Sequence, residues 1–239
     1  MISIRKSDRI FVLTGAGISA ESGLRTFRDA NGLWEDHRVE DVASPEGYRR
    51  DPKLVWRFYS ERRAQASTCL PNAGHVALAK LQASLGDRFF LCTQNVDPLH
   101  EAAGNVDVLH MHGELAKSRC ASWGTRSACG REPFVDDKVY FGELPHCACG
   151  EDVRPHICWF GEVPFGMDRI DDELRQSSVF VTIGSSGVVY PAAAFAHAAK
   201  SFGAKTYYVG PERPENARAF DEVFLGKGGD VLPSLFEIT

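Results

Sequence analysis

A glycine-rich segment near the start of the chain has the spacing of a nucleotide-binding loop. Gly15-Ala-Gly-Ile-Ser-Ala20 follows a short apolar run and matches the dinucleotide pattern, with Ala in the last place. In such loops the backbone approaches a pyrophosphate at the N-terminus of the helix that the loop opens. A tight strand-to-helix turn without a ligand is the competing interpretation of this short match.

The acidic residue that usually completes this pattern is missing. A dinucleotide-binding dehydrogenase has a second strand that ends in Asp or Glu about 20 positions later. Asp41 stands at a suitable distance but lies in a segment that we interpret as an insertion. The sequence therefore disfavours an ordinary NAD dehydrogenase and favours another use of NAD.

Four of the seven cysteines lie between residues 120 and 149. They are Cys120, Cys129, Cys147 and Cys149. Four thiolates could close a tetrahedral zinc site if the loops fold back, and no motif histidine joins them, so a metal here would be structural. A metal-free module with loose thiols is the alternative. The odd total of cysteines indicates reduced thiols.

Five apolar runs predict the buried parallel strands that must position these groups: 9–14, 88–93, 106–110, 178–183 and 205–209. Helical patterns lie between them at 72–84, 98–103, 168–176 and 191–202. Strands that alternate with helices predict an α/β fold, an open parallel sheet with helices on both faces. Ligands bind beyond the carboxyl ends of such strands.

Two stretches interrupt the alternation. Residues 36–71 are charged and aromatic, and Asp51-Pro52 opens a helical pattern there; residues 116–152 hold the cysteine cluster. We interpret both as insertions that together build a small second domain. The large NAD-binding domain is then expected to comprise residues 1–35, 72–115 and 153–239.

The composition is that of an ordinary globular protein, with 239 residues, 44% of them apolar and 25% charged. The net charge of −5 argues against nucleic acid as a partner and does not repel a lysine-rich peptide. No apolar stretch approaches the ~20 residues of a membrane span, and no secretory signal is evident at the start. We expect a cytoplasmic protein with no membrane partner.

Five motifs, in their order along the chain, resemble the sirtuin signature. They are Gly15-Ala-Gly-Ile-Ser-Ala-Glu-Ser-Gly-Leu-Arg-Thr-Phe-Arg28, Thr93-Gln-Asn-Val-Asp97, His110-Met-His-Gly-Glu-Leu115, Trp159-Phe-Gly-Glu162 and Gly184-Ser-Ser-Gly-Val-Val-Tyr-Pro191. The resemblance covers nearly the whole chain and looks closest to the bacterial CobB type, class III. It implies a Rossmann-like NAD-binding domain, a small domain of helical and zinc modules, and acyl-lysine proteins or peptides as substrates.

The resemblance implies NAD-dependent protein-lysine deacylation, with nicotinamide and O-acyl-ADP-ribose as products. The general base should be an imidazole whose pKa lies near the working pH. The family base stands at His112, so His110 is expected to be structural. Asn95 is expected to contact the ribose side and to order water, which makes His112 and Asn95 the catalytic candidates.

The same resemblance implies a cofactor-binding set. Asp97 would hydrogen-bond the nicotinamide carboxamide, and a helix cap before Pro98 is its competing role. Phe27 would shield the reaction from water, unless it is an ordinary core residue. The full set is Gly15, Ala16, Gly17, Thr26, Phe27, Arg28, Trp34, Gln94, Asn95, Asp97, His112, Gly184, Ser185 and Ser186.

Tyr59 and Arg62 are three residues apart, hence on one helix face. Without the resemblance, this pair would indicate a solvent-exposed helix face. Class III sirtuins, however, carry a Tyr-x-x-Arg pair at this place that binds the carboxylate of succinyl- or malonyl-lysine. Ala43 is small and would leave room for the longer acyl chain. An extended edge is expected to pair with the substrate backbone. It consists of Phe160, Gly161, Glu162 and Val163.

The chain departs from the sirtuin pattern at two places. Sirtuins usually hold zinc with two Cys-x-x-Cys pairs, but Trp123 stands where the second ligand is expected. The four clustered cysteines are still expected to bind structural zinc. Gly210-Pro-Glu212 stands where many sirtuins have an Asn that contacts the adenine ribose, so that contact is expected to be lost.

Two other functions use NAD without this full set of residues. A NAD glycohydrolase or ADP-ribosyl transferase breaks the same nicotinamide–ribose bond but would not need Tyr59, Arg62 or a peptide-binding edge. A non-catalytic NAD or ADP-ribose sensor would have no use for His112. The sequence favours the deacylase.

Overall fold

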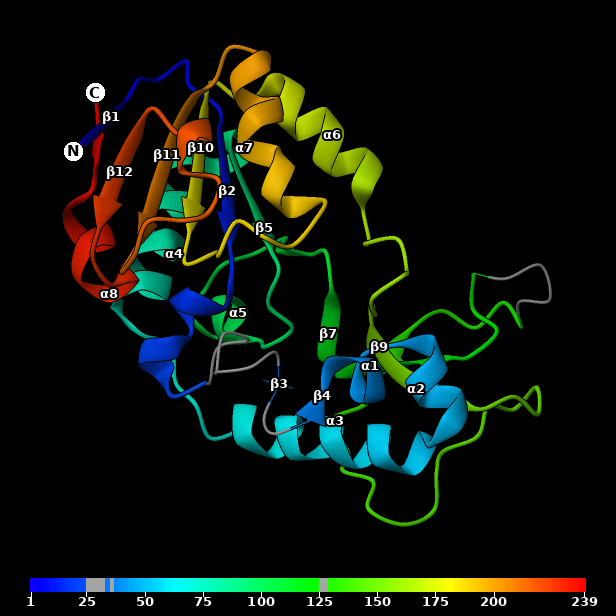
Figure 1. Cartoon of the computed structure of the whole chain (residues 1–239). Coiled ribbons are helices and arrows are strands. Elements are labelled where there is room, and N and C mark those ends of the chain that lie inside the picture. Colours follow the sequence, from blue (N-terminus) through cyan, green and yellow to red (C-terminus); the bar gives the residue numbers. More distant parts are fainter. Residues whose placement is uncertain (25–32, 35–36, 125–128) are drawn as a thin grey trace.

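A six-stranded sheet forms the centre of the computed structural model, which describes residues 1–24, 33–34, 37–124 and 129–239 (Figure 1). Each strand is parallel to its neighbours. Three strands, β2, β5 and β10, are buried along their whole length, because both faces of the sheet are covered. Along the sheet the strands are β12 (Glu222–Leu225), β11 (Lys205–Gly210), β10 (Val179–Ile183), β2 (Ile10–Thr14), β5 (Phe89–Thr93) and β6 (Leu109–His110).

Helices cover the two faces of this sheet. On one face α4 (Ala73–Leu85) and α8 (Gly228–Val231) complete an apolar core that includes Leu78 and Leu232. On the other face α6 (Met167–Gln176) and α7 (Ala192–Ser201) contribute Ile170 and Phe195 to a second core. This is the doubly covered α/β architecture that the alternation of apolar runs and helical patterns predicted.

The direction in which the chain adds strands reverses between β2 and β10. From β2 the chain moves to β5 and β6 on one side, whereas β10, β11 and β12 extend the sheet on the other. The loops that leave β2 and β10 therefore diverge and open a crevice beyond the carboxyl ends of the strands, where ligands bind in open α/β sheets. The predicted functional loops meet at this crevice.

A second, smaller sheet carries the helical module. Its strands β8 (Phe134–Val135), β7 (Gly113–Cys120) and β9 (Val153–Ile157) are antiparallel in the order β8-β7-β9. Three helices and a two-stranded hairpin adjoin it, with a core that includes Trp56 and Trp159. These elements are α1 (Val39–Val42), α2 (Pro45–Arg50), α3 (Pro52–Ala66), β3 (Leu33–Trp34) and β4 (His37–Arg38).

The two sheets divide the chain differently from the expected ranges. β7 runs across the boundary expected after residue 115, and β9, which the ranges assign to the large domain, pairs with β7. The division into residues 1–35, 72–115 and 153–239 on one side and 36–71 and 116–152 on the other stays a prediction.

Local signals place the starts of the two longest helices. The Asp51 carboxylate accepts a hydrogen bond from the Leu54 amide at 3.0 Å, and Pro52 takes the first helical position of α3. Asn72 caps α4 in the same way, with its side-chain oxygen 2.9 Å from the Gly74 amide nitrogen. Both starts agree with the sequence prediction.

The glycine-rich segment does not open an α-helix, so this part of the prediction was wrong. Two 3-10 turns follow β2 instead, at Ala16–Ile18 and Ala20–Ser22. Gly23 ends the second turn with a φ of 92°, in the left-handed region that favours glycine. A pyrophosphate at this loop would therefore meet a turn, without the dipole of a long helix.

The remaining elements are short. At the chain ends β1 (Ile2–Ile4) pairs parallel with β13 (Phe236–Ile238), and the termini lie side by side in Figure 1. Within the described part of the chain, no helix combines the length and apolar character needed to cross a membrane. The short elements not yet mentioned are α5 (Leu99–Ala102) and the 3-10 turns Gly86–Arg88, Ala217–Ala219 and Leu232–Ser234.

Candidate active site

A cavity of about 730 Å³ lies at the crevice, lined on one side by the large sheet and on the other by the small domain. The loops after β2, β5 and β10 supply residues 15–17, 94–97 and 184–186. The opposite wall, called the small-domain wall below, is formed by the helical module and the turn after β9, which supply Ala43, Tyr59, Arg62 and residues 159–162. The volume lies within the range of about 300–1,000 Å³ typical of ligand and cofactor pockets.

Glycines bring the two loops at the switch point into contact. A Cβ on Gly17 would lie 2.7 Å from the Cα of Gly184, and a Cβ on Gly15 would lie 2.9 Å from the Cα of Ser185. Gly184 also has a φ of 62°. The glycines are thus needed for backbone packing between the loops, and this packing leaves both loops at the cavity wall, where a nucleotide could approach the backbone closely.

His112 is half-buried between β6 and β7 and lines the cavity. Its Nδ1 lies 3.0 Å from the carbonyl oxygen of Gln94. Because a carbonyl only accepts, Nδ1 carries the hydrogen and the lone pair of the neutral ring lies on Nε2. Burial lowers the pKa of His112, so the ring is neutral near pH 7 and able to take a proton.

His110 has a different environment and lies outside the residues that line this cavity. Its Nδ1 lies 2.8 Å from the Asn95 carbonyl oxygen, and its Nε2 lies 2.8 Å from Oε1 of Glu101. Burial alone would lower the pKa of His110, but its hydrogen bonds and the Glu101 charge outweigh burial and raise it. Both ring nitrogens have partners, which supports the structural role expected for His110.

Ser19 joins two of the predicted cofactor residues. Its hydroxyl donates to Oδ2 of Asp97 at 3.1 Å and accepts from the side-chain amide of Asn95 at 3.0 Å. The second carboxylate oxygen of Asp97 accepts from the Leu99 amide at 3.1 Å. Burial raises the pKa of Asp97. Asp97 thus contacts the first residue of α5 without being its N-cap, a position that Pro98 takes, and Asp97 also lines the cavity.

Gln94 connects the β5 loop to the β10 loop. Its side-chain amide donates to the Ser185 hydroxyl at 2.9 Å, while its backbone carbonyl holds His112. The phenol of Tyr208 donates to the Ser185 carbonyl at 3.1 Å. The loops after β5 and β10 are thus tied together across the cavity floor.

The small-domain wall carries the predicted acyl-binding residues. Tyr59 is fully buried, and its hydroxyl accepts from Nε1 of Trp159 at 3.0 Å. The guanidinium carbon of Arg62 lies 4.4 Å from the centre of the Phe58 ring, and one terminal nitrogen lies 3.8 Å from Glu61. Ala43, Tyr59 and Arg62 all line the cavity, as the prediction required.

The expected extended edge at residues 160–163 is a turn instead. The Glu162 amide donates to the Trp159 carbonyl at 3.0 Å, and Gly161 has a φ of 89°. Glu162 points to a buried guanidinium, since its oxygens accept from both terminal nitrogens of Arg154 at 2.7 and 3.0 Å. That ion pair stabilises the turn. Phe160, Gly161 and Glu162 line the cavity, whereas Val163 does not.

Part of the predicted cofactor set lies outside the described residues. Thr26, Phe27 and Arg28 belong to residues 25–32, which the structure does not describe. Trp34 is described only as a backbone position of β3.

The four clustered cysteines come together in space. Their sulfur atoms all lie within 4.8 Å of one another, with Cys120 and Cys149 3.6 Å apart and Cys129 and Cys147 3.8 Å apart. A tetrahedral zinc ion with Zn–S bonds of about 2.3 Å holds its sulfurs about 3.8 Å apart, so the set fits zinc. The irregular spacing in the sequence closes because β7 and β9 bring Cys120 beside the Cys147–Cys149 turn.

Comparison with known proteins identifies the family. The model of the Sir2 family matches residues 15–191, which is most of the chain. The chain belongs to the Sir2 family. This Sir2 chain is 52% identical to the NAD-dependent protein deacylase of Escherichia coli K12, over 96% of this chain and 81% of that protein. It is 49% identical to the protein of the same name from Shewanella oneidensis, over 95% and 93%.

Solved Sir2 structures have the same fold. A Sir2 homologue in complex with NAD is 35% identical and superposes with a TM-score of 0.85, covering 96% of this chain and 89% of the other. A mutant Sir2 homologue with ADP-ribose gives a TM-score of 0.86 at 34% identity, covering 96% and 91%.

Several residues that line the Sir2 cavity were not predicted from the sequence, and Ser19 and Tyr208 are two whose side chains hold other parts of the site. Ser19 lies inside the first motif, but its contacts with Asn95 and Asp97 depend on folding. Tyr208 fills the space that a side chain at position 210 would need, which accounts for Gly210. The alternation of β11, which points residues 208 and 210 to one face, is the signal that relates the two.

Proposed function

We propose that this Sir2 chain is an NAD-dependent protein-lysine deacylase that moves the acyl group of a modified lysine to ADP-ribose. The observation that carries the proposal is the neutral His112 ring, held through Nδ1, in a cavity with glycine loops at one end and Tyr59 and Arg62 at the other. The names of the similar bacterial proteins support the same activity. The products are nicotinamide, O-acyl-ADP-ribose and the free lysine.

When bound, NAD supplies the ribose that receives the acyl group. The loops at Gly15, Gly17 and Gly184 would hold the phosphates, with Ser185 and Ser186 donating to phosphate or ribose oxygens. Asn95 would contact the ribose and Asp97 the nicotinamide amide, both held in place by Ser19. Nε2 of His112 would take the proton of a ribose hydroxyl. Thr26, Phe27, Arg28 and Trp34 stay predictions.

The reaction can be tested directly by its products. Purified protein, NAD and an acetyl-lysine peptide should give O-acetyl-ADP-ribose and free peptide in equal amounts by mass spectrometry. Nicotinamide should be released only when the acyl peptide is present. Release of nicotinamide at the same rate without peptide would indicate a glycohydrolase and contradict the proposal.

The acyl class follows from the small-domain wall. Arg62 offers a planar fork that matches a carboxylate, and Tyr59 lies one turn away on the same face of α3. Ala43 leaves space beside them. We therefore propose succinyl- and malonyl-lysine as substrates in addition to acetyl-lysine.

Replacement of Arg62 by Met tests the acyl class. A charged hydrogen bond is worth about 1.5–3 kcal/mol, so R62M should lower kcat/KM for a succinyl peptide roughly ten- to a hundredfold. Activity on the matched acetyl peptide should change little, because acetyl has no carboxylate. If R62M hydrolyses the succinyl peptide as well as the unaltered protein does, Arg62 does not read a carboxylate.

The partners would be acyl-lysine proteins or peptides, bound in part through Phe160, Gly161 and Glu162 at the cavity mouth. A role for Val163 and a cytoplasmic location stay predictions. Zinc would be held by Cys120, Cys129, Cys147 and Cys149 and would be structural, since four thiolates leave no open position.

A further inference from the structure

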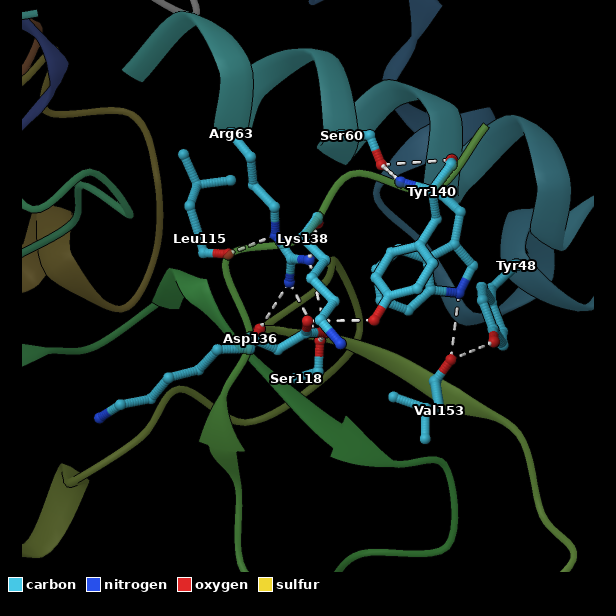
Figure 2. Close-up of polar contacts among 11 residues, drawn as sticks. Tyr48, Ser60, Arg63, Leu115, Ser118, Asp136, Lys138, Tyr140 and Val153 are labelled. Atoms are coloured by element: carbon cyan, nitrogen blue, oxygen red, sulfur yellow. Dashed lines mark hydrogen bonds and ion pairs between the residues drawn. The ribbon is translucent and has the colours of Figure 1, made fainter. Parts of the chain in front are cut away.

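A buried polar network fastens α3 to the small sheet (Figure 2). Arg63 is its centre, with a side chain that is 3% exposed. A guanidinium has five N–H donors, and five acceptors surround this one. They are the carbonyls of Leu115, Lys117 and Lys138, the hydroxyl of Ser118 and Oδ2 of Asp136, at 2.7, 3.2, 2.7, 3.0 and 3.4 Å.

Two more side chains of α3 lie on the same stripe as Arg63. Trp56 donates its indole hydrogen to the Val153 carbonyl at 3.1 Å. The Ser60 hydroxyl accepts from the Tyr140 amide at 2.7 Å and lies 3.3 Å from the Tyr140 carbonyl (Figure 2). Residues 56, 60 and 63 follow the i, i+4, i+7 spacing of one helix face. Three directional anchors on one stripe fix the rotation of the helix about its axis.

A neighbouring stripe of the same helix faces the cavity. Tyr59, Arg62 and Gln65 line it, at the i, i+3, i+6 spacing. Successive helical residues are turned by about 100° about the axis, so Ser60 follows Tyr59 and Arg63 follows Arg62 at that fixed angle. Because α3 is rigid between these positions, the direction of the anchor stripe sets the direction of the cavity stripe.

We infer that Arg63 is a positioning residue for acyl selectivity: by locking the rotation of α3, it fixes where Arg62 meets an acidic acyl group. This inference rests on the proposed function. Asp136 and Tyr140, which complete the network, lie between Cys129 and Cys147 in the chain, and the Tyr140 hydroxyl donates to Asp136 at 3.1 Å. The segment between the cysteines is therefore part of the device that aims Arg62.

The R63K variant tests the inference because Lys keeps the charge but has three donors in place of a five-donor fork. The ratio of kcat/KM for succinyl over acetyl peptide should fall about tenfold, through the KM of the succinyl peptide, since a misdirected Arg62 loses its charged hydrogen bond. The acetyl peptide should react nearly as before. K53Q is the matched control: it removes a charge from an exposed position of α3 and should leave the ratio unchanged.

The S60A variant removes a weaker anchor on the same helix face as Arg63. It should lower the same succinyl-to-acetyl ratio, but by less than R63K does. It decides the matter if R63K does not fold, as judged by its melting curve. Equal losses with both peptides, or an unchanged ratio in both variants, would overturn the inference.

Failure of the proposed function has a separate signature. If the unaltered protein releases no nicotinamide with either peptide, the deacylase proposal falls. Binding of a fluorescein-labelled succinyl-lysine peptide, measured by anisotropy, then decides the inference alone: R63K must bind about tenfold more weakly than K53Q, and equal binding overturns it.

Discussion

The two ends of the cavity are built by different means. At the large sheet, strand ends and glycines bring backbone to within contact of backbone, as between Gly17 and Gly184. At the small domain, the wall is a helix whose orientation depends on side chains such as Arg63 that reach across to carbonyl groups of β7. The first arrangement tolerates no added atom, whereas the second depends on directional polar contacts being kept.

This difference suggests how the two ends fail. A change in the glycine loops should impair every substrate equally, because each reaction uses the same nucleotide. A change in the α3 anchors should alter the choice of acyl group and spare NAD. Each prediction below tests whether the two ends are separable in this way.

The largest effect is expected where the two ends meet, at His112. Replacement by Ala removes the base and should lower kcat about 10²–10⁴-fold. Acetyl and succinyl peptides should lose activity to the same extent in steady-state assays, because proton transfer is common to both. H110N should instead lower the melting temperature of the protein, because His110 is expected to be structural. Normal turnover by H112A would contradict the catalytic assignment.

A single methyl group at Gly17 should break the nucleotide end. The Cβ of G17A would lie 2.7 Å from backbone atoms of Gly184, an overpacking worth about 1–3 kcal/mol. We expect a higher KM for NAD with an unchanged succinyl-to-acetyl ratio. G142A is the control, because a Cβ there meets no atom within 4 Å. A changed ratio in G17A would show that the ends are coupled.

Loss of the metal site should affect the acyl end. C149S removes one of the four thiolates, whereas C69S alters a thiol outside the cluster. C149S should lose zinc by elemental analysis and melt lower, by about 2–4 °C for each kcal/mol lost. Its selectivity for succinyl peptide should fall while the KM for NAD stays near normal. A rise in the KM for NAD alone would count against separable ends.

The smallest effect concerns the pH dependence of stability, through two buried histidines that contact Thr14 and Ser19 behind the glycine loop. Burial lowers the pKa of His75 to about 4, and burial together with the neighbouring His75 and His110 lowers that of His100 to about 3. The unfolded chain binds these protons near pH 6.5, so the folded state loses stability as the pH falls below 6.5, by about 1 kcal/mol for each ring at pH 5.5. The contribution of His110 to stability has the opposite sign. Because its pKa is raised in the folded state, protonated His110 stabilises the fold below pH 6.5. The melting temperature should fall from pH 7 to 5, and a constant value would contradict this account.

The large sheet was predictable because its information is local. The apolar runs that became β2, β5, β10 and β11 have the length and composition of buried strands, and Asp51 and Asn72 mark helix starts. Strand ends gather at one edge, so the glycine loops, Gln94 and His112 could be placed together in advance.

The residues that were missed owe their position to distant parts of the chain. The 3-10 turns after β2 pack against Gly184, some 170 residues away, and the Gly17 amide donates to the Gly184 carbonyl. The turn at 159–162 contacts the helical module, since the Phe160 amide donates to the Ala43 carbonyl at 3.0 Å. Ser19 and Arg63 look like ordinary polar residues until folding surrounds them with partners. The four cysteines could be proposed as a metal site, but the sequence could not show that their sulfur atoms meet, because it is the pairing of β7 with β9 that brings the irregularly spaced cysteines together.

His112 is held at its ring and at its backbone, since Gln94 accepts from Nδ1 and the His112 carbonyl accepts from the Cys158 amide at 2.8 Å. In the proposed reaction a proton taken up at Nε2 has no exit through the other nitrogen. It must leave through Nε2, on the side of the ring that faces the cavity. The amine that the reaction frees from the acyl group is a proton acceptor in that cavity, so the base can be regenerated there.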